Sequence, residues 1–262
     1  MLTDTEPLDG ESLNISRKKG IQSVEIGCDV LAYMGSLRTP KSLTAIAAAL
    51  NMSPSKAYFY VTSFVRKGII TRDDAGLYRL GPAALNLGLA ALAQVDAVEE
   101  ARHAMMRIRS SVDQSIQLSV WGSAGPTIVH RLPAAQWHLD LRLGAVLSPL
   151  TATGRTLMTS FPEASVERII AETLKKSKPS DPWHKFSVAK AMGIFLEDRE
   201  RGITTGFGNT HPGVLSLAAP VRDQSHNTVA AITITGSDDQ FDTSYDGVFA
   251  KALLEGVRGI FS

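Results

Sequence analysis

The chain has 262 residues, of which 44% are hydrophobic, and its formal net charge is +1. That length holds one or two domains with a sizeable core. The single cysteine, Cys28, excludes an internal disulfide and a cysteine-rich zinc site. No stretch approaches the roughly 18 apolar residues of a membrane-spanning helix, and the polar first residues lack the apolar segment of a signal peptide. We therefore expect a cytoplasmic protein with no membrane partner.

Positive charge is concentrated near the start of the chain. Between Ser12 and Arg72 the acidic residues are Glu25 and Asp29 alone. The basic residues of the same stretch are Arg17, Lys18, Lys19, Arg38, Lys41, Lys56, Arg66, Lys67 and Arg72. Such a segment either contacts nucleic-acid phosphates or forms an ordinary solvated surface, and charge alone does not choose between the two.

Three helices are predicted after a disordered tail over residues 1–19. Apolar residues recur with helical spacing in residues 23–34 and again in residues 43–50. Ser53 followed by Pro54 is a helix-start signal, because proline loses nothing at a position whose amide has no partner. This pair begins the third helix.

A hairpin is predicted after the third helix, which ends at Gly68. Two strand-like runs flank the turn sequence Asp74-Ala75-Gly76. Helix, helix, turn, helix and hairpin, in that order, form a winged helix-turn-helix, which we assign to residues 20–82. In such a domain the third helix enters the major groove of double-stranded DNA.

The third helix has one apolar face and one face left for a partner. Ala57, Tyr60, Val61 and Phe64 have the spacing of a buried face. The candidate DNA-binding residues, which project elsewhere or flank the helix, are Ser53, Ser55, Lys56, Tyr58, Phe59, Thr62 and, in the predicted wing, Arg72. Packing of the exposed aromatic pair on a neighbouring helix or a dimer partner is the alternative.

The remainder of the chain predicts a linker helix and an α+β domain. Residues 83–110 form one helical stretch whose apolar side contacts either a second copy or the chain's own second domain. Within residues 111–262 the strands are expected at 115–122, 126–132, 137–144, 214–221 and 228–236. Helices are expected at 151–161, 163–176, 187–202 and 247–261. This order favours a mostly antiparallel sheet.

Little in the sequence favours an enzyme. The histidines lack metal-ligand spacing, and the chain has no GxSxG motif. The segment TATGRT, residues 151–156, also lacks the pattern of a phosphate-binding loop. We therefore expect neither catalysis nor a metal or other cofactor.

Four motifs together resemble the IclR-type bacterial transcriptional regulators. They are GIQSVEIGCDVLAYM, the segment from LTAIAAALNMSPSKAYFYV to LGPAALNLG, LTATGRTLM, and PGVLSLAAPVRDQSHNTVAAITITG. The resemblance implies a winged helix-turn-helix, a helical linker and a GAF/PAS-like effector-binding domain. It also implies a homodimer or tetramer on a pseudo-palindromic DNA operator, with Ser55, Lys56, Tyr58 and Phe59 facing DNA. Phe59 departs from the family, which often has arginine there.

The resemblance also implies a pocket for a small organic effector, such as a carboxylate or an aromatic catabolite. The candidate effector-binding residues are Thr151, Thr153, Gly154, Asn209, Ser216, Thr233 and Thr235. Gly206 is a second departure, since an aspartate falls there in some members. The expected function is repression of a catabolic or transport operon. A winged helix that binds a protein instead of DNA is the alternative, and salt dependence separates the two.

Overall fold

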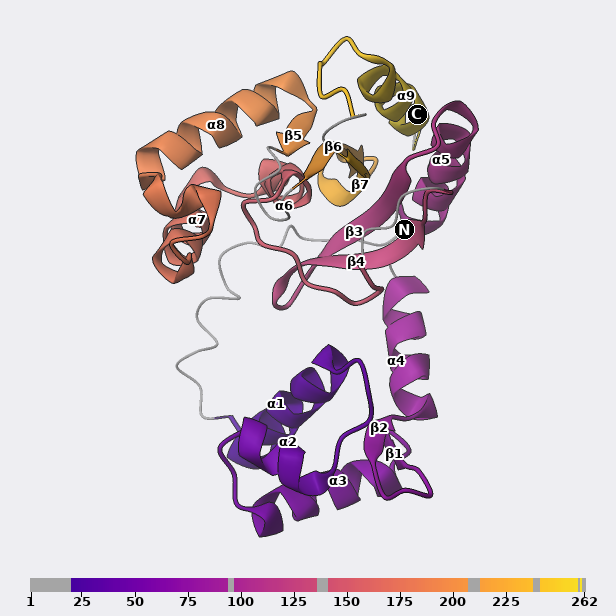
Figure 1. Cartoon of the computed structure of the whole chain (residues 1–262), viewed down its shortest axis with the longest axis vertical. Coiled ribbons are helices and arrows are strands. Elements are labelled where there is room, and N and C mark those ends of the chain that lie inside the picture. Colours follow the sequence, from indigo (N-terminus) through magenta and orange to yellow (C-terminus); the bar gives the residue numbers. More distant parts are fainter. Residues whose placement is uncertain are drawn as a thin grey trace, which may run out of the picture. The chain divides into compact units, whose positions relative to one another are not determined.

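The structure is a computed structural model that describes residues 20–93, 97–135, 141–206, 213–237, 241–258 and 260 (Figure 1). The chain divides into two compact units, Met1–Ala90 and Ala91–Ser262. Each unit has its own hydrophobic core.

The first unit is a winged helix-turn-helix, as predicted. Its elements are α1 (Gln22–Ser36), α2 (Leu43–Ala49), α3 (Pro54–Arg66), β1 (Ile70–Arg72) and β2 (Tyr78–Leu80). Ser42 Oγ accepts a hydrogen bond from the Ala45 amide at 3.3 Å, and Ser53 Oγ accepts one from the Lys56 amide at 3.2 Å. Both serines therefore cap the helices that the sequence assigned to them.

The core of this unit joins all three helices to the wing. Its buried members are Val30, Met34, Ile46, Val61, Ile70 and Tyr78. Tyr60 and Phe64 pack against them partly buried, and Ala57 is fully buried. The predicted apolar face of α3 is thus confirmed. β1 and β2 pair antiparallel, with Ile70 opposite Leu80.

The described residues of the predicted linker stretch, 83–93 and 97–110, are helical. They belong to α4 (Pro82–Ala93) and α5 (Ala97–Ser111). α4 has no buried residue, and Leu85, Leu87 and Leu89 are exposed on it. α5 instead buries Ala104, Met105 and Ile108 in the core of the second unit.

In the described residues of the second unit, five strands form one antiparallel sheet. The strands are β3 (Ser115–Gly122), β4 (Gly125–Leu132), β5 (Thr204–Gly206), β6 (Val214–Arg222) and β7 (Thr228–Ser237). Their order across the sheet is β4-β3-β7-β6-β5. Residues on β3, β6 and β7 alternate between the two faces, which places two sets of side chains in two different layers.

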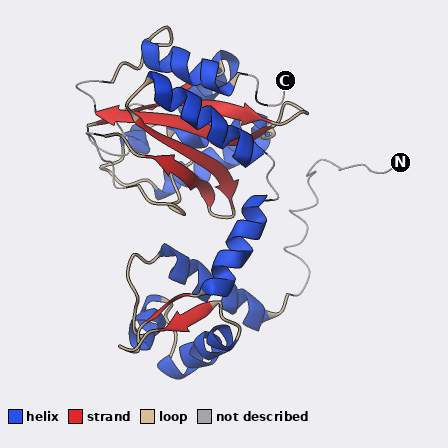
Figure 2. Ribbon diagram, turned by 90° about the vertical axis from the view of Figure 1, so that its right-hand side faces the viewer, coloured by secondary structure: helices blue, strands red, loops and turns tan. Residues whose placement is uncertain are grey.

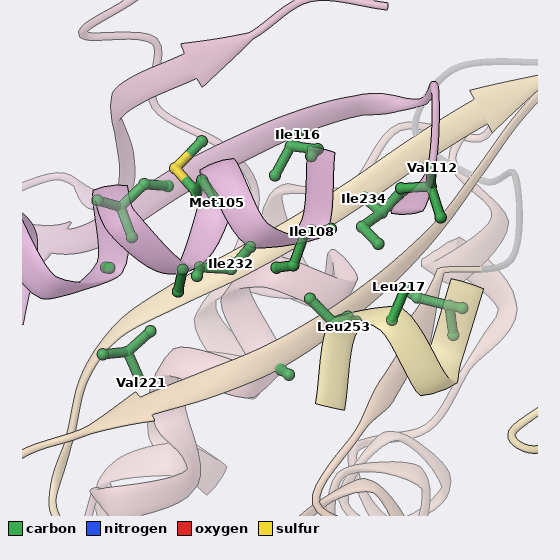
Figure 3. Packing of buried hydrophobic residues seen from close by; sticks show 14 of the residues in the cluster. Met105, Ile108, Val112, Ile116, Leu217, Val221, Ile232, Ile234 and Leu253 are labelled. Atoms are coloured by element: carbon green, nitrogen blue, oxygen red, sulfur yellow. The ribbon is translucent and has the colours of Figure 1, made fainter. Parts of the chain in front are cut away.

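Helices cover both faces of this sheet (Figure 2). On one face α5 and α9 (Val248–Val257) pack over the sheet, and their apolar side chains interdigitate with those of the strands (Figure 3). On the other lie α6 (Ala152–Leu157), η3 (Met158–Ser160), α7 (Glu163–Lys176), η4 (Pro182–Lys185) and α8 (Val188–Arg201). A second cluster around Trp183 and Phe195 holds this helical layer together.

Two details of the predicted strands are wrong. Of the strand expected at residues 137–144, residues 137–140 lie outside the described part, and residues 141–144 form no strand. Backbone hydrogen bonds to β4 begin at its end instead: Gly144 donates to the Ile128 carbonyl at 2.8 Å, and Leu147 to Pro126 at 2.7 Å. The strands predicted from the sequence also do not include β5, a three-residue edge strand paired with β6.

Candidate DNA-binding and effector sites

The free face of α3 presents two large aromatic side chains to solvent. Tyr58 is 51% exposed and Phe59 is 70% exposed, with their rings edge to face and 6.2 Å apart. Burying apolar surface drives folding, so aromatic side chains left this exposed favour a binding role. Ser55 and Lys56 are exposed on the first turn of the same helix, and Thr62, one turn after Tyr58, is half-buried.

Two more of the predicted DNA-binding residues flank α3. Ser53 is exposed, and its hydroxyl is used as the cap of the helix. Arg72 is exposed at the end of β1, in the wing, where its guanidinium lies 5.6 Å from the centre of the Tyr78 ring. The first unit therefore carries cationic and hydroxyl groups on α3 and on the wing, and groups of these kinds contact phosphates in protein–DNA complexes.

The second unit has a polar layer between its sheet and α6. Thr153 of α6 and Thr233 of β7 are buried, and their hydroxyl oxygens are 2.9 Å apart in a hydrogen bond that either can donate. Gln117 of β3, opposite Thr233 in the sheet, donates from Nε2 to Thr153 Oγ1 at 3.4 Å. Thr235, on the same face as Thr233, donates to the Ser115 carbonyl at 3.4 Å. Hydroxyls and an amide buried together can hold an oxygen-rich ligand.

The start of α6 is fixed by the predicted residues Thr151 and Gly154. Thr151 caps the helix, because its hydroxyl accepts from the Gly154 amide at 3.1 Å. A side chain at position 154 would overlap the carbonyl of Pro149. Glycine is thus required by close packing, and these two residues position Thr153 against the sheet.

Ser216 joins the same group of residues from β6. It pairs with Thr235 on one side and with Gly206 on the other. A β-carbon at Gly206 would overlap Ser216 Oγ and lie 3.4 Å from the β-carbon of Ala152. The departure at Gly206 is therefore matched to the serine opposite it. Asn209, the remaining predicted effector residue, lies outside the described residues.

A buried ion pair beside this layer was not predicted. Arg155 Nε donates to Asp198 Oδ2 at 2.7 Å, and the guanidinium also donates to the carbonyls of Leu150 and Thr205 at 2.6 Å each. It lies 5.1 Å from the centre of the Trp183 ring. Burial raises the pKa of Asp198 above its usual value, and the charge of Arg155 offsets part of that rise. The pair ties α6, the helix that carries Thr153, to α8 and to the edge strand β5.

Two kinds of site are missing from the described part of the chain. No group of three or more histidine, cysteine, aspartate or glutamate side chains there could hold a metal ion. None of the helices described is long and apolar enough to cross a membrane.

A winged helix-turn-helix followed by a sheet domain with a buried polar layer defines a class of protein, the ligand-responsive DNA-binding transcriptional regulators. Comparison with known families specifies this class further. The IclR helix-turn-helix domain matches residues 23–74, and the bacterial transcriptional regulator IclR C-terminal domain matches residues 89–261. The chain belongs to the IclR family of bacterial transcriptional regulators.

Known relatives extend over nearly the whole chain. The glycerol operon regulatory protein of Streptomyces coelicolor is 28% identical over 253 residues, which cover 92% of this chain and 93% of that protein. An IclR regulator from Alicyclobacillus acidocaldarius has the same fold, with a TM-score of 0.77 at 18% identity over 92% of this chain and 98% of its own. An IclR homologue from Microbacterium hydrocarbonoxydans, solved in complex with 4-hydroxybenzoate, has a TM-score of 0.74 at 20% identity, covering 89% and 95%.

Proposed function

We propose that this protein represses a catabolic or transport operon by binding a pseudo-palindromic operator as a homodimer or tetramer in the cytoplasm. The observation that carries the proposal is the free face of α3, where Lys56, Tyr58 and Phe59 are exposed on a capped helix. Lys56 contacts phosphate, whereas Tyr58 and Phe59 contact sugars and thymine methyl groups. The wing residue Arg72 adds a further phosphate contact.

A helix that carries phenylalanine in place of arginine reads a different sequence. Arginine recognises guanine through two hydrogen bonds, and phenylalanine can make only apolar contacts. Phe59 therefore favours an operator with thymine at the position that this side chain reaches. The operator differs at that position from the operators of relatives that have arginine.

The effector is a small organic acid bound in the polar layer of the second unit. Thr153, Thr233 and Thr235 supply hydroxyls for its carboxylate, and Ser216 lies next to Thr235 on the neighbouring strand. The relative solved with 4-hydroxybenzoate supports an aromatic or other carboxylate as the class of ligand. An effector that binds one state of the regulator more tightly shifts the balance between operator-bound and free forms.

The exposed α4 supports a self-association role. Leu85 and Leu89, one turn apart on the same side of α4, leave apolar surface on a helix that has no buried residue. Two copies of such a helix can bury that surface against each other, and a two-fold dimer matches two operator half-sites.

Selection of bound duplexes from a random DNA pool tests this function. The full chain should enrich a sequence with two-fold symmetry. Pooled metabolites containing organic acids should then release the enriched duplex. Failure to enrich any sequence, with and without the metabolite pool, would refute the proposal in favour of a winged helix that binds protein.

A further inference from the structure

Among the residues that the structure describes in the second unit, two buried hydroxyl groups lack a hydrogen-bond partner. Ser119 Oγ and Thr156 Oγ1 belong to completely buried residues, and neither has a donor or acceptor within reach in the part of the chain that the structure describes. Burying an unpaired hydroxyl is unfavourable, because its lost hydrogen bonds to water are not replaced. Native proteins retain few such groups, so two on adjacent elements call for a functional explanation.

Ser119 extends the polar face of β3. Side chains two residues apart on a strand share a face, so Ser119 lies on the same side of the sheet as Gln117. Its partner on β7 is Ala231, two residues before Thr233. Ser119 is therefore one step further along the same layer than the Gln117, Thr153 and Thr233 group.

Thr156 approaches the same region from the helical side. It follows Thr153 by three residues and so lies on the same side of α6. Thr153 is hydrogen-bonded to Thr233, and Thr159, three residues later again, is bonded to Thr228 at 2.7 Å between the two Oγ1 atoms. Because α6 and η3 are fixed to β7 at both points, Thr156 lies over the intervening part of that strand, which includes Ala231.

We propose that Ser119 and Thr156 form the inner end of the effector site, and that the effector is an organic acid with a second polar group. This inference rests on the effector site proposed above. The carboxylate binds at Thr153, Thr233 and Thr235, and a hydroxyl or second carboxylate binds at Ser119 and Thr156. Two residues along a strand span about 7 Å. That separation is of the order found between the polar groups of a para-hydroxylated aromatic acid or a four-carbon dicarboxylic acid.

The stability of the unliganded protein gives the first test. Thr156→Val and Ser119→Ala remove hydroxyls that have no partner, so each variant should melt at the wild-type temperature or above it. Thr159→Val is the matched control, because it removes a paired hydroxyl three residues away and should lower the melting temperature. If all three variants lower it equally, Ser119 and Thr156 have structural partners in solution, and the proposal is wrong.

Binding of matched acids to the full chain gives the second test. The probes are benzoate with 4-hydroxybenzoate, and butyrate with succinate, measured by calorimetry. In whichever pair binds to the protein, 4-hydroxybenzoate or succinate should bind at least about tenfold more tightly than its partner without the second polar group. The double variant S119A/T156V should abolish that difference.

The variant Thr235→Val separates this inference from the effector site itself. It should weaken both members of a pair, because it acts on the shared carboxylate. Suppose that Thr235→Val weakens binding, but that 4-hydroxybenzoate and succinate bind no more tightly than benzoate and butyrate. The effector site is then supported, and the proposal that Ser119 and Thr156 form its inner end is refuted. Absence of binding by all four acids up to about 10 mM also overturns the proposal.

Discussion

Arg155 Nε lies 2.7 Å from Asp198 Oδ2, and the two side chains are 1% and 3% exposed. The arginine belongs to α6, which carries the proposed effector residue Thr153, and the aspartate belongs to α8. The same guanidinium binds the carbonyl of Thr205, next to Gly206 in β5. One buried cation thus fixes the helix on one side of the polar layer to the edge strand of the sheet.

Breaking this pair should strongly destabilise the protein. Asp198→Ala leaves the Arg155 charge buried without its counter-ion, and we expect a loss of about 3–5 kcal/mol in the free energy of unfolding. Urea denaturation at neutral pH measures it. Glu163→Ala is the control, because the Arg199–Glu163 pair is partly exposed at 3.5 Å and should contribute less than about 1 kcal/mol. Equal losses in the two variants would contradict a structural role for the buried pair.

His130 should make stability depend on pH. Burial, followed by the charge of Arg102, lowers the pKa of His130 below 6.5, and Glu99 opposes the shift. Since the unfolded chain then binds the proton more tightly, stability rises with pH between the folded pKa and about 6.5 and is level above that. Urea unfolding of wild type and of His130→Gln at a series of pH values measures this effect. The difference between their free energies of unfolding should rise up to about pH 6.5 and be constant above it.

The variant Arg102→Gln provides the control for that pH dependence. Removing this charge should move the pKa of His130 back toward its ordinary value. The pH range over which the free energy of unfolding rises should therefore become narrower. Parallel pH curves for wild type and His130→Gln would show that folding does not perturb the histidine.

Replacing Gly206 by a larger residue should destabilise the protein, because Ser216 is paired with it on the neighbouring strand. Gly206→Ala places a methyl group against Ser216 Oγ and the β-carbon of Ala152, and we expect a loss of about 1–3 kcal/mol from overpacking. Ser216→Gly in the same chain should restore part of it. A double-mutant cycle by thermal or urea unfolding measures the coupling, and strictly additive losses would argue against a matched pair.

Phe59 should govern sequence preference at one operator position. Phe59→Arg gives α3 a side chain that reads guanine through two hydrogen bonds, a discrimination of about 1–3 kcal/mol against other bases. Selection from a random duplex pool should therefore recover guanine at one position of each half-site where wild type does not. Identical recovered sequences for the two proteins would show that Phe59 does not reach the bases.

The winged helix-turn-helix could be predicted because its signals are local. Ser42 and Ser53 start helices through hydrogen bonds to amides three residues on, and Pro54 suits the first turn because it has no amide hydrogen to satisfy. The face of Ala57 and Val61 follows from helical spacing alone. The hairpin between residues 69 and 80 needed only its turn sequence. Neighbouring residues therefore specified this unit without knowledge of the rest of the chain.

The second unit depends on contacts between distant residues, and prediction was less complete there. β5 has three residues, too few for a periodic pattern, and exists through its pairing with β6. Arg155 and Asp198 are 43 positions apart, so no spacing rule could connect them. The family resemblance supplied Thr233 and Thr235 as candidates. Ser119 and Thr156 became candidates only from the structure, in which their buried hydroxyls have no hydrogen-bond partner among the described residues.

The salt dependence of operator binding tests the central claim most directly. The logarithm of affinity for the selected duplex should fall steeply with the logarithm of salt concentration, because each neutralised phosphate releases counter-ions. Lys56→Ala should reduce that slope by about one for each protein copy bound and weaken binding to all duplexes alike. The control Lys251→Ala, an exposed lysine on α9, should leave the slope unchanged. A slope that is shallow in wild type, or the same in Lys56→Ala, would contradict the assignment of α3 as the DNA-reading helix.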